Sequence, residues 1–145
     1  MSISSLLRSA SLTSLLFAVG HMLGGLQWWS PPGDTEVLRA MQSFRFDADG
    51  SSRTYWDFYV GFGLIIGVFL TAQAVLLWQL AELAKEQSAR LQPIVAMLLV
   101  TAVANAALAW KFFFFVPLVL GIVIAMLLAF ALCRRYAWAL RSHAS

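Results

Sequence analysis

Apolar residues run in four long stretches along the chain. The stretches cover residues 6–29, 55–80, 93–115 and 117–134. Each is long enough to cross a hydrocarbon core of about 30 Å, which takes roughly 20 residues of α-helix. The last two stretches together would be about twice too long for one crossing, so the chain has to reverse between them. The pattern therefore predicts an all-α fold, an integral membrane four-helix bundle.

The reversal between the third and fourth stretches is expected at residues 111–117, which include four consecutive phenylalanines. Pro117 lacks a backbone donor and disfavours helix at the preceding Val116. A tight hairpin at this point would place the phenylalanines at the membrane interface.

A long extracytoplasmic loop is expected between helices 1 and 2, at residues 30–54. Residues 31–34 and 47–50 carry turn signals, and the apolar residues within 36–46 fit one face of a short helix on the membrane surface. Residues 47–50 also resemble part of a calcium loop. That alignment puts Arg45 and Trp56 where acidic ligands are required, so a plain turn is expected.

Composition and charge agree with a membrane protein. The 145 residues are 61% hydrophobic and 12% charged, which is far from the balance of a soluble domain, and their number fits a single domain over residues 1–145. The net charge is +3, but the basic residues flank the apolar stretches and form no patch, which argues against nucleic-acid binding.

The basic residues also predict the topology. With four spans, both chain ends lie on one side, together with six arginines and lysines. Those six are Arg8, Lys85, Arg90, Arg134, Arg135 and Arg141. The other side carries Arg39, Arg45, Arg53 and Lys111. The excess predicts that both termini lie in the cytoplasm, with the protein in a bacterial inner membrane.

Two glycine pairs lie within the first two apolar stretches. Gly20 and Gly24 are four residues apart, as are Gly63 and Gly67. Because residues four apart share a helix face, each pair is expected to let a neighbouring helix approach closely.

The main polar candidates inside the apolar stretches are His21, Asp57, Asn105 and Lys111, with Gln27 and Gln73 as weaker members. Such groups are costly in a membrane and usually face the bundle interior or water. From helix rise, the depths of the four main candidates below the outer interface are about 10, 3, 13 and 4 to 5 Å, respectively. Three helices could therefore direct polar groups into one outward-opening pocket.

Each of the four main candidates also has a structural interpretation. Asp57 with Thr54 fits a capping box at a helix start. Lys111 can extend its ammonium to the interface, and Asn105 can form a hydrogen bond between helices. His21 is too deep to reach the interface easily, so its imidazole needs either a neighbouring helix or a bound molecule as partner.

The chain resembles small, uncharacterised bacterial four-helix inner-membrane protein families. The resemblance rests on Gly20-His21, on the run from Phe58 to Gly63, and on the phenylalanines before Pro117. It spans most of the chain and implies an inner-membrane four-helix protein. It implies no activity.

The leading hypothesis for function is a binding protein for a lipid-like or quinone-like amphiphile in an outward-facing pocket. The expected ligand-binding residues are His21, Asp57, Asn105, Lys111, Trp28, Trp56 and Trp110. One alternative is an intramembrane isomerase-like enzyme that uses His21 and Asp57 as an acid–base pair. Another is a small structural or assembly subunit, as a homodimer or with a larger membrane partner.

Other chemistries find little support in the sequence. One buried histidine and one carboxylate fall short of a zinc site, and haem would need a second buried histidine, so no metal or cofactor is expected. Four short helices leave little room for alternating access, which argues against transport.

Overall fold

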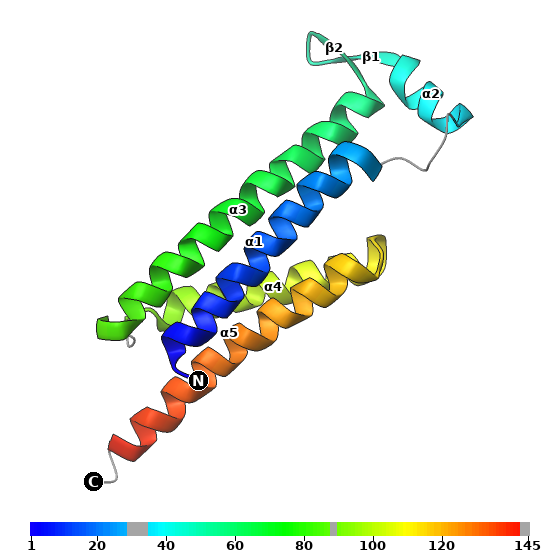
Figure 1. Ribbon diagram of the computed structural model, residues 1–145. Helices are drawn as coiled ribbons and strands as arrows, with labels where there is room; N and C mark the ends of the chain where they lie inside the picture. Colours follow the sequence, from blue (N-terminus) through cyan, green and yellow to red (C-terminus); the bar gives the residue numbers. More distant parts are fainter. Residues whose placement is uncertain (29–34, 88–89, 143–145) are drawn as a thin grey trace. The chain divides into compact units, whose positions relative to one another are not determined.

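The computed structural model describes residues 1–28, 35–87 and 90–142, with side chains over 1–25, 35–86 and 90–134. Within these residues the chain forms five helices and one small hairpin, and it is mostly helical (Figure 1). The helices are α1 (Ile3–Trp28), α2 (Glu36–Ser43), α3 (Tyr55–Gln87), α4 (Gln92–Phe112) and α5 (Phe115–Ser142). By length and composition, α1, α3, α4 and α5 could each cross a membrane, as the sequence predicts.

The chain divides into two compact units. The first contains Met1–Phe17 and Thr71–Ser145, and the second contains Ala18–Leu70. Both α1 and α3 contribute to each unit, because the boundaries fall within these helices.

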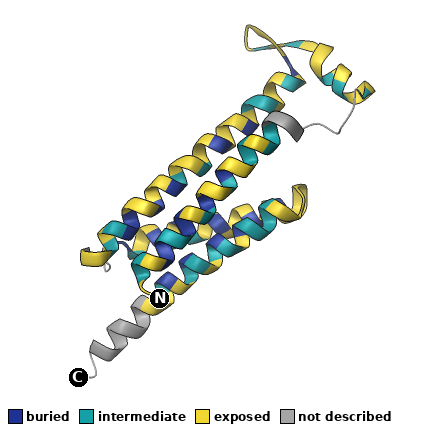
Figure 2. Cartoon of the chain, in the orientation of Figure 1, coloured by how far each residue is buried: buried dark blue, intermediate teal, exposed yellow. Residues whose placement is uncertain are grey.

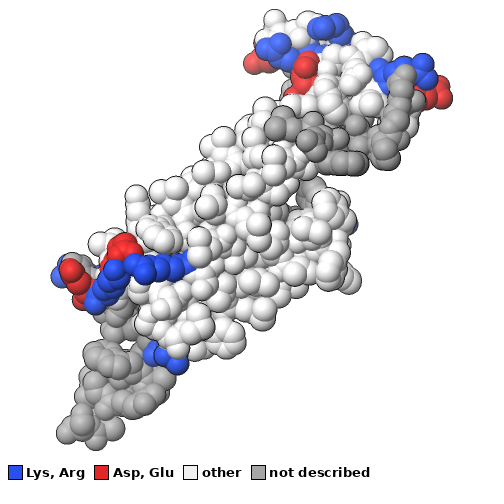
Figure 3. Space-filling model, in the orientation of Figure 1, with Lys and Arg blue, Asp and Glu red and all other residues white. Residues whose placement is uncertain are grey.

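The core of the first unit combines side chains from all four long helices. Leu7 of α1 and Leu77 of α3 are fully buried, and Val95 of α4 and Leu128 of α5 are almost so. Many large apolar side chains instead point outward, among them Val100, 69% exposed. Figure 2 shows such exposed positions along all the long helices. On the face drawn in Figure 3, Lys, Arg, Asp and Glu lie near the ends of the long helices and other residues cover their middle. An apolar surface of this kind is suited to the hydrocarbon core of a membrane.

Helices α4 and α5 pack closely because small residues line their contact. Ala102, Ala106 and Ala109 are buried on α4, opposite a buried glycine on α5. A Cβ atom added at that glycine, Gly121, would lie 3.4 Å from both Cα and Cβ of Ala106. Small residues at such contacts bring helix backbones together, which increases dispersion contact between them.

The turn between α4 and α5 falls earlier than Pro117. Helix α4 ends at Phe112 and α5 begins at Phe115, so only two residues separate them. Pro117 and Val116 lie in the first turn of α5, which corrects the expectation that proline disfavours helix here. In a first helical turn the missing N–H of proline would have no intrahelical acceptor anyway, so its cost is small.

Other helix ends also differ from the prediction. Helix α1 begins at Ile3, where the Ser2 hydroxyl accepts a hydrogen bond from the Ser5 backbone N–H at 3.0 Å. Helix α3 continues to Gln87, seven residues beyond the predicted end. The end of the predicted first stretch at Trp29 and the predicted turn at 31–34 lie outside the described residues.

The connection between α1 and α3 holds more structure than the sequence predicted. The short helix α2 ends at Ser43, and residues 44–46 are extended instead of helical. Strand β1 (Arg45–Ala48) then pairs antiparallel with β2 (Ser51–Thr54), which leads directly into α3 (Figure 1). The fold is therefore not purely helical.

Residues 49 and 50 make the hairpin turn. Asp49 has φ 55° and Gly50 has φ 80°, both in the left-handed region. A two-residue turn with positive φ at both positions matches the twist of paired strands, and Asp-Gly is a favoured pair for it. The turn expected at residues 47–50 is confirmed, whereas the strands beside it were missed.

Close packing of α4 on α5 makes Gly121 sensitive to size. We expect Gly121→Leu to lower the free energy of unfolding by about 1–3 kcal/mol, because the larger side chain forces the helices apart. Thermal unfolding of the detergent-solubilised protein would measure the loss. Gly61→Leu is the matched control, since a Cβ at Gly61 meets nothing within 4 Å. Equal loss in both variants would refute the packing argument.

Candidate functional site

His21 joins α1 to α3 in the second unit. Its Nε2 lies 2.8 Å from the backbone carbonyl oxygen of Gly63. A carbonyl oxygen only accepts, so Nε2 carries the proton and donates to it. The imidazole is half-buried. The contact is a hydrogen bond between helices, one of the two roles that the sequence left open for His21.

The glycine pair on α3 permits this approach. Gly63 and Gly67 are both buried, and a Cβ added at Gly67 would clash with the Met22 side chain. The predicted close approach at this pair is confirmed. On α1 the expectation is wrong, because a Cβ added at Gly20 or Gly24 would meet no atom within 4 Å. Among the described residues, no neighbouring helix therefore packs against Gly20 and Gly24 of α1.

Asp57 forms a capping box with Thr54 at the start of α3. The Asp57 Oδ2 accepts a hydrogen bond from the Thr54 backbone N–H at 2.8 Å, and the Thr54 hydroxyl accepts from the Asp57 N–H at 3.1 Å. These contacts satisfy two backbone donors that a helix start leaves without partners. The structural interpretation of Asp57 is confirmed.

The two groups of the hypothetical acid–base pair are held in different places. Asp57 precedes Gly63, the partner of His21, by six residues, which is about 9 Å along the axis of α3. Its carboxylate folds back on Thr54, toward the hairpin. These contacts lend no support to direct proton transfer between His21 and Asp57.

A series of stacked and tilted aromatic rings connects the hairpin to α3, and it was not predicted from the sequence. The rings of Phe44 and Tyr55 stack with centroids 5.8 Å apart, and Phe46 lies 4.9 Å from Tyr55 and 5.7 Å from Phe58. Phe62 continues the series, 6.0 Å from Phe58. The three α3 rings are spaced by three and four residues, which is the signal that could have identified this face.

The remaining predicted site residues are spread over both units. Trp56, in the second unit, is half-buried and stacks on Tyr59 with centroids 5.5 Å apart. The side chain of Trp28 lies outside the described residues. In the first unit, Trp110 is 77% exposed, and the exposed Lys111 ammonium lies 5.0 Å from the Phe112 ring centroid. A pocket shared by these residues stays a prediction.

Asn105 differs from Gln73 and Ser11, two other polar residues of the long helices. It is exposed on α4, seven residues before the helix ends, and its side chain makes no hydrogen bond within the described residues. By contrast, Gln73 donates to the Ser14 hydroxyl at 3.0 Å, and the buried Ser11 hydroxyl donates to the Ala74 carbonyl at 2.7 Å. Among these amides and hydroxyls, Asn105 alone lacks a partner in the described part of the chain.

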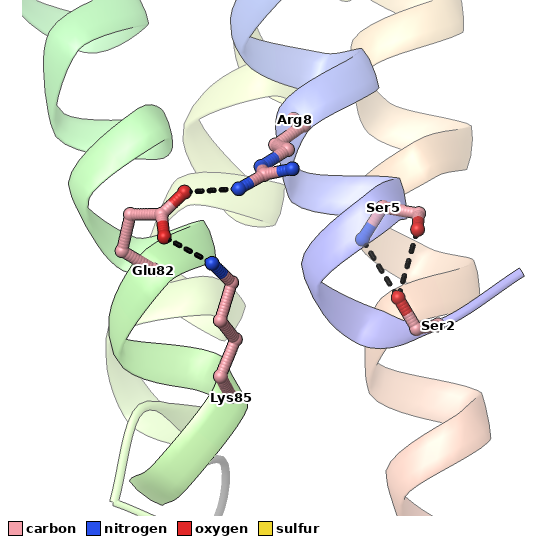
Figure 4. Close-up of polar contacts among 5 residues, drawn as sticks. All are labelled: Ser2, Ser5, Arg8, Glu82 and Lys85. Atoms are coloured by element: carbon pink, nitrogen blue, oxygen red, sulfur yellow. Dashed lines mark hydrogen bonds and ion pairs between the residues drawn. The ribbon is translucent and has the colours of Figure 1, made fainter.

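A charged cluster links α1 and α3 in the first unit. Figure 4 shows Arg8 and Lys85 at the two oxygens of the Glu82 carboxylate. The Arg8 guanidinium also lies over the Trp78 ring, 5.4 Å from its centroid. The sequence does not predict this ion pair, because 74 residues separate Arg8 from Glu82 and no local pattern pairs them.

The described residues show no cluster of metal ligands, and a small pocket lies away from the predicted site residues that the structure describes. The described residues contain no group of three or more histidine, cysteine or acidic side chains that could hold a metal ion. A small apolar pocket in the first unit is lined mostly by aliphatic side chains, among them Ile3, Leu91 and Leu132. None of the predicted ligand-binding residues lines it.

We expect Asp57→Ala to lower the free energy of unfolding by about 1 kcal/mol, the typical cost of losing a helix cap. The matched control is Asp47→Ala, which removes an exposed carboxylate from β1 outside the capping box. Denaturation of the purified protein in detergent would compare the two. An unchanged stability for Asp57→Ala would contradict the capping role.

Comparisons with protein-family models, with curated proteins and with solved structures find no match to this chain.

Proposed function

We propose that the chain is a multi-pass membrane protein of the bacterial inner membrane, built as a four-helix bundle with both termini in the cytoplasm. Four long apolar helices support the membrane assignment, and the hydrophobic core shared by all four supports the bundle. The excess of basic residues on the side of the termini supports the orientation.

Within that membrane, we propose that the protein acts as a small subunit that associates with another spanning helix through the outer face of α4. The observation that carries this proposal is Asn105, an exposed amide within a spanning helix that has no hydrogen-bond partner in the described residues. An amide in hydrocarbon loses its hydrogen bonds to water, and no protein group replaces them here. It therefore favours association with a polar group on a second helix.

The rest of the α4 face suits such a contact. Met97, Thr101 and Leu108 are exposed and lie with Asn105 at intervals of three and four residues, which places them on one side of the helix. The Thr101 hydroxyl is already satisfied, because it donates to the Met97 carbonyl at 3.0 Å. Asn105 is therefore the polar centre of an otherwise satisfied face.

A second copy of the chain is the partner that the amide fits best. An amide carries both donors and an acceptor, so two asparagines related by a two-fold axis satisfy each other. The open pair Gly20 and Gly24 on α1 is a further surface where a helix backbone could approach closely.

We expect Asn105→Leu to weaken self-association by about three- to thirtyfold, the range for one hydrogen bond between helices in a membrane. The measurement is sedimentation equilibrium in detergent, supported by native mass spectrometry. Gln73→Leu is the matched control: it removes an amide that already bonds Ser14 within the chain, so it should cost stability and leave association unchanged.

Cross-linking would locate the contact. Thr101→Cys in a Cys133→Ser background places a single thiol on the α4 face, one turn from Asn105, and should form disulfide dimers in membranes. The proposal fails if Asn105→Leu associates as the parent chain does and the thiol at position 101 forms no dimer.

Amphiphile binding is the second candidate function. It is favoured by the half-buried imidazole of His21 and by the stacked Trp56 and Tyr59 near the start of α3, since such surfaces suit a polar head on an apolar body. A molecule that copurifies with the parent chain, is lost from His21→Leu and is retained by Gln73→Leu would favour this function over the first.

A further inference from the structure

The charged cluster of α1 and α3 points to a function that subunit association does not use. Arg8 lies five residues after the start of its span, and Glu82 lies four residues before the end of its own. These offsets correspond to about 8 and 6 Å along the helices, within reach of lipid headgroups. In the proposed topology, this is the cytoplasmic side.

The cluster has a net positive charge, because its basic side chains outnumber its acidic ones. Arg8 and Lys85 share the single Glu82 carboxylate, which leaves one positive charge over. The next ionisable residues along the chain, Glu86 and Arg90, are exposed and of opposite sign, so the excess remains. An anion is the natural complement of such a pair of cations.

Arg8 has hydrogen-bond donors that its contact with Glu82 does not use. A guanidinium carries five N–H donors, and the described residues engage Nη2 alone, through Glu82. Nε is buried without a hydrogen-bond partner, while the side chain as a whole is 42% exposed. The two N–H donors of Nη1 have no partner among the described residues, and a phosphate at this half-exposed side chain could accept from them.

The surroundings orient the guanidinium before any ligand binds. It lies over the ring of Trp78, which is 44% exposed, and Glu82 accepts a hydrogen bond from its Nη2. Holding a side chain in its binding geometry lowers the entropy cost of binding. Exposed tryptophan is also typical of the level where headgroups meet acyl chains.

We propose that Arg8 and Lys85 form a binding site for the phosphate of an anionic phospholipid in the cytoplasmic leaflet, with Trp78 against the glycerol and upper acyl chain. Glu82 positions the two cations and competes with the phosphate for them. The site rests on the proposed membrane topology and is independent of association through α4.

The test uses the full chain in nanodiscs of equal parts phosphatidylglycerol and phosphatidylcholine. Native mass spectrometry releases the protein from the disc and counts the phosphatidylglycerol molecules that stay bound to it. Arg8→Gln and Lys85→Gln should each lower retention about fivefold, because each removes a charge-assisted contact with the bound phosphate. Lys111→Gln is the matched control, because Lys111 is also exposed and also lies against an aromatic ring. Its retention should be unchanged, and an equal loss would overturn the site.

A second variant separates lipid binding from simple stabilisation. Glu82→Gln breaks the same ion pair as Arg8→Gln but leaves both cations in place. We expect it to retain at least as much phosphatidylglycerol as the parent chain. If both variants lose lipid alike, the ion pair only stabilises the helices and the site is refuted.

Two further experiments identify the ligand and separate the lipid site from the proposed association through α4. Inorganic phosphate added to discs of phosphatidylcholine alone should leave no Arg8-dependent adduct, and such an adduct would overturn the assignment to a lipid. Asn105→Leu should retain phosphatidylglycerol as the parent chain does, whatever its effect on association. Loss of lipid in that variant would refute the independence of the site.

Discussion

The hydrogen bond inside an apolar environment is the constraint on which this structure depends. A polar group on an apolar helix has no water to return to, so it has to find a partner in the protein. The imidazole of His21 meets a backbone carbonyl, the carboxylate of Asp57 caps the helix on which it lies, and Gln73 bonds a serine. Each contact gives a protein partner to a group that the sequence alone leaves without one.

The elements of the fold were largely predictable because they follow from local properties. Four apolar stretches of spanning length predict four long helices, and Thr54 and Asp57 are three residues apart, so their cap can be read directly. The hairpin was harder, since strands of four residues are too short for a clear alternation and the phenylalanines beside them also fit a helix face.

The candidate site was less predictable, because depth along a helix says nothing about the direction a side chain takes around it. Successive residues differ in direction by about 100°, so two residues at similar depth can lie on opposite faces. Asn105 shows the consequence: it lies next to the buried Ala106 and is itself exposed. Contacts such as Arg8 with Glu82 depend on which faces meet, which only the packing decides.

The two-residue connection between α4 and α5 has a consequence for biogenesis. The end of α4 and the start of α5 are three Cα steps apart, at most about 11 Å, so neither helix can travel far without the other. With no charged residue from 112 to 133, the second helix carries nothing that would oppose its entry. A translocon would therefore receive the pair as one pre-paired helical hairpin, released sideways into lipid in a single event.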